Sequence, residues 1–152
     1  MITPQSQIGE RPEFSAAEQR IFDSMTVLLD RAGLGYQGRF VEVNGQRIHY
    51  LDYGSGPPVL LLHGGGAGSA IWFRQIATLA ESHRVIAPDH PVFRLSSQDA
   101  YEAPIVDSIF RYLTGFMDAL GLDGVDVAGA PCRWERKRPC RWRSTTRCVL
   151  IG

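Results

Sequence analysis

Hydrophobic and polar positions divide the chain into a short series of predicted elements, beginning with an amphipathic helix. Ser15 opens the stretch SAAEQRIFDSMTVLLDRAG, and Ser15 and Glu18 have the spacing of a capping box. Apolar residues then recur on one helical face, at Ile21, Phe22, Met25, Leu28 and Leu29. Gly33 supplies the stop. We expect this face to pack on the rest of the fold, with partner binding as the alternative.

Two strand-like runs follow in RFVEVNGQRIHYLDYG, on either side of Asn44-Gly45. Asn-Gly is the strongest short hairpin signal, because a two-residue type I′ turn needs positive φ at both positions. Three apolar runs, PPVLLLHGGG, RVIAPDH and GVDVAG, fit strands that are covered on both faces, as parallel sheets require. Helices are expected between them, at about residues 70–81 and 104–120. This alternation predicts an α/β fold with right-handed crossovers between parallel strands.

Length and composition fit one domain, since the chain has 152 residues, 44% of them hydrophobic. We expect residues 1–13 to be a mobile arm, residues 14–130 to form the domain, and residues 131–152 to be a basic tail of different character. Residues 1–126 hold fifteen of the sixteen acidic residues against nine arginines, whereas residues 131–148 hold seven basic residues and one glutamate. The formal charge of zero therefore averages two unlike parts.

The sequence also bears on the cellular location. The first residues, MITPQSQIGERPEF, lack the basic start and apolar run of a signal peptide, and no stretch has the length of a membrane span. All three cysteines lie in the tail, and a cysteine-free body suits a reducing compartment. We therefore expect a cytoplasmic location and no membrane partner.

The stretch LLLHGGGAGSAIW places His63 and three glycines where a central strand is followed by a helix. Glycine amides in such a turn can point at a developing negative charge, which is the chemistry of an oxyanion hole. A tight turn without a ligand is the alternative. A dinucleotide site fits less well, because the G-x-G-x-x-G spacing is not met cleanly.

The order of these motifs resembles the N-terminal half of an α/β-hydrolase over residues 39–129: a hairpin, VLLLHGGGAGS, RVIAPDHP, an amphipathic helix and VDVAG. The HGGG turn is most similar to that of the carbon–carbon bond hydrolases and esterase-like members. The resemblance implies a truncated fold with three parallel strands, and an oxyanion hole that uses the backbone N–H of Gly65 or Gly66. It also implies loop support from His63 and Asp89, a small ester or ketone-type substrate, and no cofactor or metal.

A loop motif follows the next strand of the family, commonly D-x-P-G-F-G-x-S, and this chain reads DHPVFRLSS there. Asp89, Pro91, Phe93 and Ser96 match it. Val92 and Arg94 stand where glycines are usual. Because a β-branched residue tolerates unusual φ values poorly, a distorted loop is expected.

The resemblance breaks at the nucleophile elbow, the strained G-x-S-x-G turn that follows the third parallel strand in the family. Gly129 occupies the first glycine position, but Pro131 stands at the serine position and Arg133 at the second glycine. Cys132 is out of register by one residue and is not expected to replace the serine. The family's acid and base would lie beyond residue 152, so we expect the chain as written to be inactive. A sheet that ends at its third parallel strand would also leave an exposed edge.

Four interpretations of the tail stay open. A zinc site would need closer cysteines or a histidine, a nucleic-acid surface would use its interleaved arginines and tryptophans, and a disordered tail leaves the repeated PCRW unexplained. The fourth, which we favour, is a frameshift. Codons for residues 131–148, read from their third base, permit LSMGAETALSLALDHPV, which looks like the serine, elbow glycine and helix of the family.

Under the frameshift interpretation the frame is regained near Val149, and the final VLIG could form another strand. The competing function is a non-catalytic binding protein whose tail contacts nucleic acid or an acidic partner. No known nucleic-acid motif is present, so nucleic acid is not the expected partner. The sequence does not predict an oligomeric state.

Overall fold

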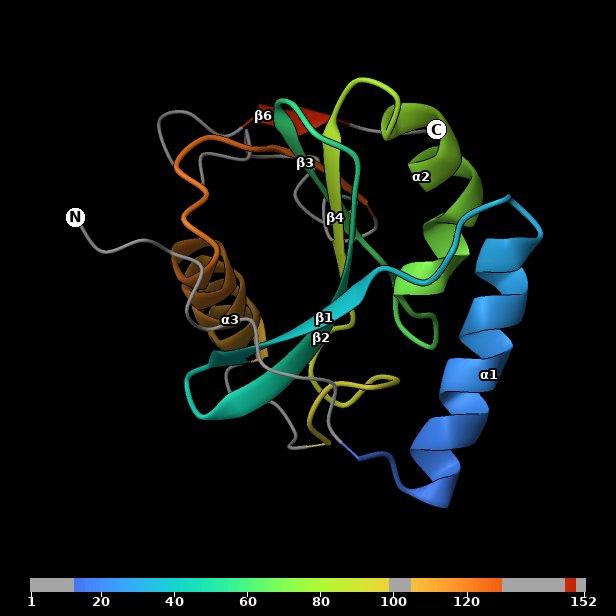
Figure 1. Ribbon diagram of the computed structural model, residues 1–152. Helices are drawn as coiled ribbons and strands as arrows, with labels where there is room; N and C mark the ends of the chain where they lie inside the picture. The colour runs from blue at the N-terminus through green and yellow to red at the C-terminus, as the bar shows by residue number, and fades with distance from the viewer. Residues whose placement is uncertain (1–12, 99–104, 130–146, 150–152) are drawn as a thin grey trace.

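A six-stranded mixed sheet, in the order β1-β2-β4-β3-β5-β6, forms the centre of the molecule (Figure 1). The computed structural model describes residues 13–98, 105–129 and 147–149. The strands are β1 (Gly38–Val43), β2 (Gln46–Tyr53), β3 (Pro58–Leu62), β4 (Arg84–Pro88), β5 (Asp126–Gly129) and β6 (Arg147–Val149). The helices are α1 (Ala16–Asp30), the short 3-10 helix η2 (Ser69–Trp72), α2 (Phe73–Leu79) and α3 (Ile105–Ala119).

The hairpin predicted at Asn44-Gly45 is confirmed. Both residues have positive φ, 52° and 77°, and Val43 pairs with Gln46 across the turn in an antiparallel ladder. The β2 strand is also antiparallel to β4, whereas β4, β3, β5 and β6 run parallel to one another. The α/β class predicted from the alternation of apolar runs is therefore confirmed.

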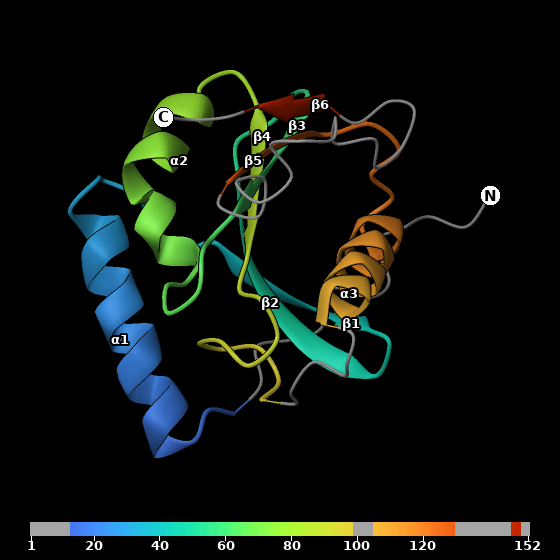
Figure 2. The ribbon, with the colours of Figure 1, turned by 180° about the vertical axis from the view of Figure 1, so that it is seen from behind.

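Each face of the sheet carries its own hydrophobic core, because successive side chains of a strand point to opposite faces. On β3, Leu60 and Leu62 face α3, while Val59 and Leu61 face α1 and α2. Figures 1 and 2 show α3 alone on one side of the sheet and α1 with α2 on the other. The two-sided cover explains why β3 and β4 are apolar without alternation.

Local signals set the ends of the helices. The Glu18 N–H donates to Ser15 Oγ at 3.3 Å and the Ser15 N–H donates to Glu18 Oε2 at 2.9 Å, so the predicted capping box is present. Gly33 has a φ of 72° three residues after α1 ends, as predicted for a stop. The helix expected at 70–81 is divided into η2 and α2, and α3 matches the range expected at 104–120 closely.

A fourth parallel strand corrects the predicted count of three and the exposed edge. Residues Arg147–Val149 form β6, which pairs with β5 in the register Asp126↔Arg147, Val127↔Cys148 and Ala128↔Val149. The edge of β5 is therefore covered by β6, of which only Val149 belongs to the VLIG run suggested as a strand. Residues 1–12 of the predicted arm lie outside the described residues, as do Pro131, Cys132 and the rest of the tail apart from Arg147–Val149.

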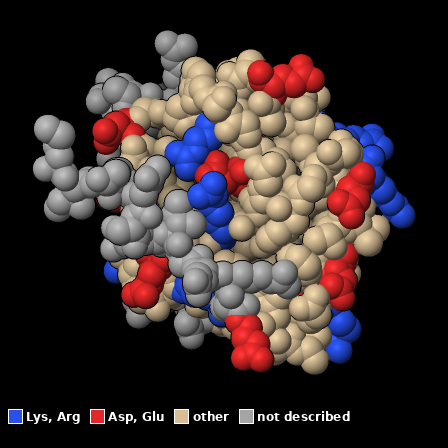
Figure 3. Space-filling model, viewed as in Figure 1, with Lys and Arg blue, Asp and Glu red and all other residues tan. Residues whose placement is uncertain are grey.

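The distribution of surface charge and the length of the helices were also considered in the sequence. Acidic and basic side chains are interspersed on the face shown in Figure 3, with no large area of a single sign. Among the described residues, no helix is long and apolar enough to cross a membrane.

Candidate functional site

The glycine turn follows β3 directly, at the carboxyl end of the strand. His63 is buried, whereas Gly65 and Gly66 are exposed and a side chain at either position would meet no atom. Gly66 has a φ of 78°, in the left-handed region that favours glycine. The turn closes with a hydrogen bond from the Ala67 N–H to the Gly64 carbonyl at 3.3 Å. Within the described part of the chain, the amides of Gly65 and Gly66 have no acceptor, so both can donate to a bound group.

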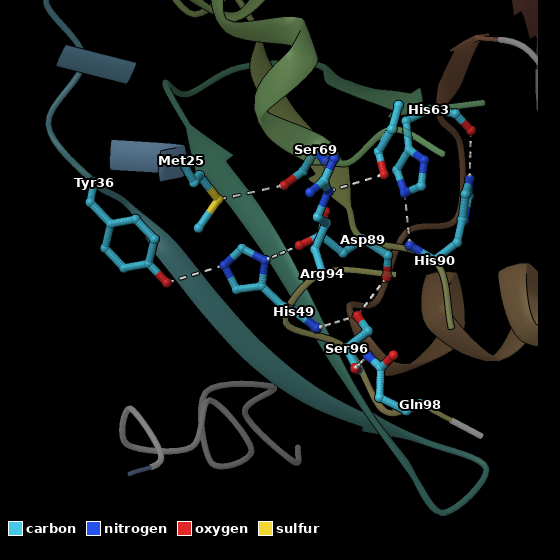
Figure 4. A network of polar contacts seen from close by, with 11 residues as sticks. Met25, Tyr36, His49, His63, Ser69, Asp89, His90, Arg94, Ser96 and Gln98 are labelled. Carbon is cyan, nitrogen blue, oxygen red and sulfur yellow. Dashed lines mark hydrogen bonds and ion pairs between the residues drawn. The ribbon is translucent and has the colours of Figure 1, made fainter. Parts of the chain in front are cut away.

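His63 ties the glycine turn to the loop that follows β4. Its Nδ1 donates to the Gly64 carbonyl at 2.8 Å. Its Nε2 accepts from the His90 N–H at 3.0 Å (Figure 4). His90 returns the contact, because its Nε2 donates to the His63 carbonyl at 3.1 Å. The two rings pack with centroids 4.3 Å apart. This reciprocal pair fixes the relative position of the two loops.

The shifted pKa values of both histidines agree with this arrangement. Burial lowers the pKa of His63 and lowers the pKa of His90 to about 3, so both rings are neutral near pH 7. A neutral His63 ring can donate at Nδ1 and accept at Nε2 in the same tautomer, as its two partners require. Its unprotonated Nε2 is committed to the His90 amide, so His63 holds the loop and does not serve as a base.

Asp89 lies at the end of β4 and joins three elements through its carboxylate. Its Oδ2 accepts from His49 Nδ1 at 2.8 Å, and its Oδ1 accepts from the Ser69 N–H at 2.6 Å. The His49 Nε2 in turn lies 3.1 Å from the Tyr36 hydroxyl. The Asp89 and His49 side chains are fully buried. Burial would raise the pKa of Asp89, but the hydrogen bond and charge interaction with His49 lower it overall.

The loop after Asp89 is closed by serine hydrogen bonds. The Ser96 hydroxyl donates to the Asp89 carbonyl at 2.6 Å and accepts from the His49 N–H at 3.0 Å. Between these anchors, Val92 and Arg94 have φ values of 65° and 55°. Val92 and Arg94 therefore lie in the left-handed region, where residues other than glycine are strained. This is the distortion expected from the missing glycines.

Gly129 brings the end of β5 against the glycine turn. It pairs with Leu62, the residue before His63, and has a φ of 143°. A Cβ at this position would overlap the Leu62 carbonyl oxygen. Only glycine therefore fits, and the chain leaves β5 immediately beside the glycine turn. The next positions, including the Pro131 and Cys132 considered as nucleophile positions, lie outside the described residues.

The structure thus brings His63, Asp89 and the two turn glycines to one edge of the sheet. Sequence reasoning missed His49 as the partner of Asp89. Its alternation with Ile48 and Tyr50 in β2 placed it on the face opposite those residues, but nothing local linked it to Asp89. Within the described ranges, no group of histidine, cysteine, aspartate or glutamate residues could hold a metal ion.

Comparisons with known proteins agree with this geometry. Residues 57–130 match a family model described as the alpha/beta hydrolase fold. "Haloalkane dehalogenase 2" of Mycobacterium tuberculosis is 36% identical over 88 residues, which are 58% of this chain and 31% of that protein. The "2-hydroxy-6-oxo-6-(2'-aminophenyl)hexa-2,4-dienoic acid hydrolase" of Metapseudomonas resinovorans is 36% identical over 104 residues, 66% of this chain and 36% of that protein.

A solved structure also has a similar fold. A serine hydrolase involved in carbazole degradation superposes with a TM-score of 0.56 at 38% identity, covering 62% of this chain and 38% of that one. The chain spans about a third of the length of the curated relatives it matches.

Proposed function

We propose that this chain derives from an enzyme that hydrolyses an ester or a carbon–carbon bond of a small molecule with a serine nucleophile. The chain belongs to the α/β-hydrolase superfamily and carries the N-terminal part of its fold. One observation carries the proposal. Gly129 pairs with Leu62, so a nucleophile two residues after Gly129 would emerge next to the open amides of the glycine turn. The names of two relatives, a dienoic acid hydrolase and a serine hydrolase, support this reaction class.

In this proposal the backbone N–H of Gly65 or Gly66 stabilises the oxyanion. When a serine oxygen attacks a carbonyl carbon, negative charge develops on the carbonyl oxygen. A fixed amide aimed at that oxygen lowers the barrier, and removing one such donor typically costs about 100-fold to 1,000-fold in rate. His63 and Asp89 position the turn, because His63 holds the Gly64 carbonyl and Asp89 holds the Ser69 amide.

The chain as written lacks the nucleophile, since Pro131 stands where the serine is expected. We propose a frameshift after Gly129 as the cause. The parallel pairing of Val149 with Ala128 of β5 supports it, because Val149 lies where the frame would be regained and where the next strand of such a sheet is needed. The acid and the base would come from residues that this chain does not contain.

Sequencing the coding DNA from the codon of Asp126 to well past that of Gly152 is the first test. A single-base correction that restores a serine elbow and continues to a later aspartate and histidine would support the proposal. A frame that stands as written and stops at Gly152 would contradict it.

An activity measurement is the second test. The purified chain should not hydrolyse p-nitrophenyl butyrate above the rate of buffer, and the frame-corrected protein should. Turnover by the chain as written that disappears in Cys132→Ala would show that Cys132 is the nucleophile and would overturn the proposal.

The alternative of a binding protein with a basic tail remains a prediction, because residues 130–146 lie outside the described part of the chain. Salt-sensitive binding to an oligonucleotide that is lost on truncation after Gly129 would favour it. The predicted cytoplasmic location also remains a prediction.

A further inference from the structure

A pocket of about 460 Å³ lies between α1 and the glycine turn, on the face of the sheet that α1 covers. This volume is in the range of small-molecule sites. One wall comes from α1, by way of Ile21, Ser24, Met25 and Leu28. The opposite wall comes from the stretch between Gly66 and Ile71, with Phe73, Asp89 and Arg94. Most of these side chains are apolar, so the pocket suits the hydrocarbon part of a ligand.

Arg94 places a positive charge in this wall. Its Nε donates to the Ala67 carbonyl at 3.3 Å and its Nη2 donates to the Gly66 carbonyl at 3.4 Å, both long for such bonds. Arg94 has no acidic partner in the described part of the chain. Asp89 also lines the pocket, but its two oxygens already accept from His49 and Ser69. The guanidinium therefore has donors left for an anion.

The backbone at Arg94 makes this placement costly. Its φ of 55° is a conformation that residues other than glycine rarely adopt. Such strain persists where the surrounding structure fixes it, and it is concentrated at binding sites and active sites. From that conformation the Arg94 side chain extends over Gly68, where an added Cβ would meet Arg94 Cγ at 2.5 Å. The Arg94 side chain thus lies along the glycine turn while it remains exposed to solvent.

We propose that this pocket binds a small amphipathic carboxylate, with its carboxylate on Arg94 and its hydrocarbon chain against Met25 and Leu28 of α1. A guanidinium recognises a carboxylate through two parallel charge-assisted hydrogen bonds, which a neutral ligand cannot reproduce. The apolar α1 wall supplies the contact that a free inorganic anion would lack. This binding site requires no catalytic step, so it stands independently of the proposed hydrolase function.

The test is an NMR titration of the full chain with hexanoate, using hexanamide as the neutral analogue of the same length. We expect hexanoate to shift the amide signals of Ser69 and Ala70 and to bind at least about 10-fold more tightly than hexanamide, the difference that one charge-assisted pair typically makes. Arg94→Gly should remove this preference and leave hexanamide binding within about twofold.

Two controls separate the charge from the fold. Val92→Gly relieves the same kind of backbone strain two residues away without changing the charge, and it should bind hexanoate like the parent. Arg74→Ala removes an arginine from α2, outside the pocket wall, and should also bind like the parent. Arg94→Gly introduces the residue that suits the left-handed conformation, so a loss of binding in that variant is not a loss of folding.

Three outcomes would overturn the proposal. They are the absence of hexanoate-induced shifts at Ser69 and Ala70, equal affinities for hexanoate and hexanamide, and unchanged hexanoate binding in Arg94→Gly.

Discussion

Removal of the Asp89 carboxylate should destabilise the protein more than removal of any comparable surface acid. In Asp89→Ala the His49 Nδ1 and the Ser69 N–H both lose their acceptor, at a place where the His49 ring is fully buried. Hydrogen bonds to a charged group contribute about 1.5–3 kcal/mol each. Two such bonds give a loss of about 3–6 kcal/mol, which overlaps the range of about 3–5 kcal/mol observed when one partner of a buried pair is removed.

Urea unfolding followed by circular dichroism measures this loss, and two variants calibrate it. In Asp89→Asn the amide oxygen can still accept from Ser69 and the amide nitrogen can donate to an unprotonated His49 Nδ1, so we expect a smaller loss of about 1–2 kcal/mol. Asp52→Ala removes a carboxylate that is 8% exposed and is paired with Arg84 and Arg39, which are 33% and 43% exposed; because water screens both arginines, it should cost less than Asp89→Ala, about 2 kcal/mol or less. Equal losses in Asp89→Ala and Asp52→Ala would refute the reasoning.

Three further changes test other parts of the structure. His90 has a pKa of about 3 in the folded chain and an ordinary value near 6.5 when unfolded, so only the unfolded chain takes up this proton as the pH falls below about 6.5. The unfolding free energy should therefore fall by up to about 1.4 kcal/mol per pH unit from this residue. Urea titrations between about pH 7 and about pH 5 should show a shallower dependence of the unfolding free energy on pH in His90→Gln. Val92→Gly should raise the unfolding free energy by about 1 kcal/mol by relieving a strained φ, whereas Val27→Gly in α1 should lower it by a similar amount; a loss in Val92→Gly would contradict the strain. Gly129→Ala should cost at least twice as much as Gly121→Ala, because only Gly129 faces a backbone oxygen, and equal thermal midpoints in the two variants would exclude that contact.

The features predicted correctly from the sequence are those that local rules determine. The Asn44-Gly45 turn requires only two residues with positive φ, and the capping box requires only Ser15 and Glu18 at the right spacing. The apolar runs gave the parallel strands because a strand covered on both faces must be apolar throughout. In each case the cause lies within a few residues of the effect.

The remaining features depend on contacts between distant segments. His49 and Asp89 are forty residues apart in the chain, and neither residue type signals the other. The strand β6 forms because an edge of β5 is available, which the three-residue run Arg147–Val149 does not reveal by itself. The pocket beside Arg94 likewise requires the packing of α1 against the glycine turn. Pattern and propensity cannot supply such nonlocal contacts.

The loop after β4 shows how the edge of the sheet keeps its geometry without its usual glycines. Ser96 bonds to Asp89 at the start of the loop, the Val92 N–H donates to the Ser97 carbonyl at 2.8 Å, and the Ser97 N–H donates to the Arg47 carbonyl at 2.8 Å. With both ends held, Val92 and Arg94 adopt left-handed backbone conformations despite their side chains.

The glycine turn is likewise held in place by hydrogen bonds, which involve His63, His90 and Asp89. None of these contacts involves a residue after Gly129. The proposed glycine-turn half of the oxyanion hole is therefore held without any residue after Gly129, and we expect a frame-corrected protein to add the serine, the second oxyanion amide that follows it, the acid and the base. Activity in that protein without any other substitution is what this independence requires. Activity that returns only after Val92 or Arg94 is changed to glycine would show that the strained loop had lost its working geometry.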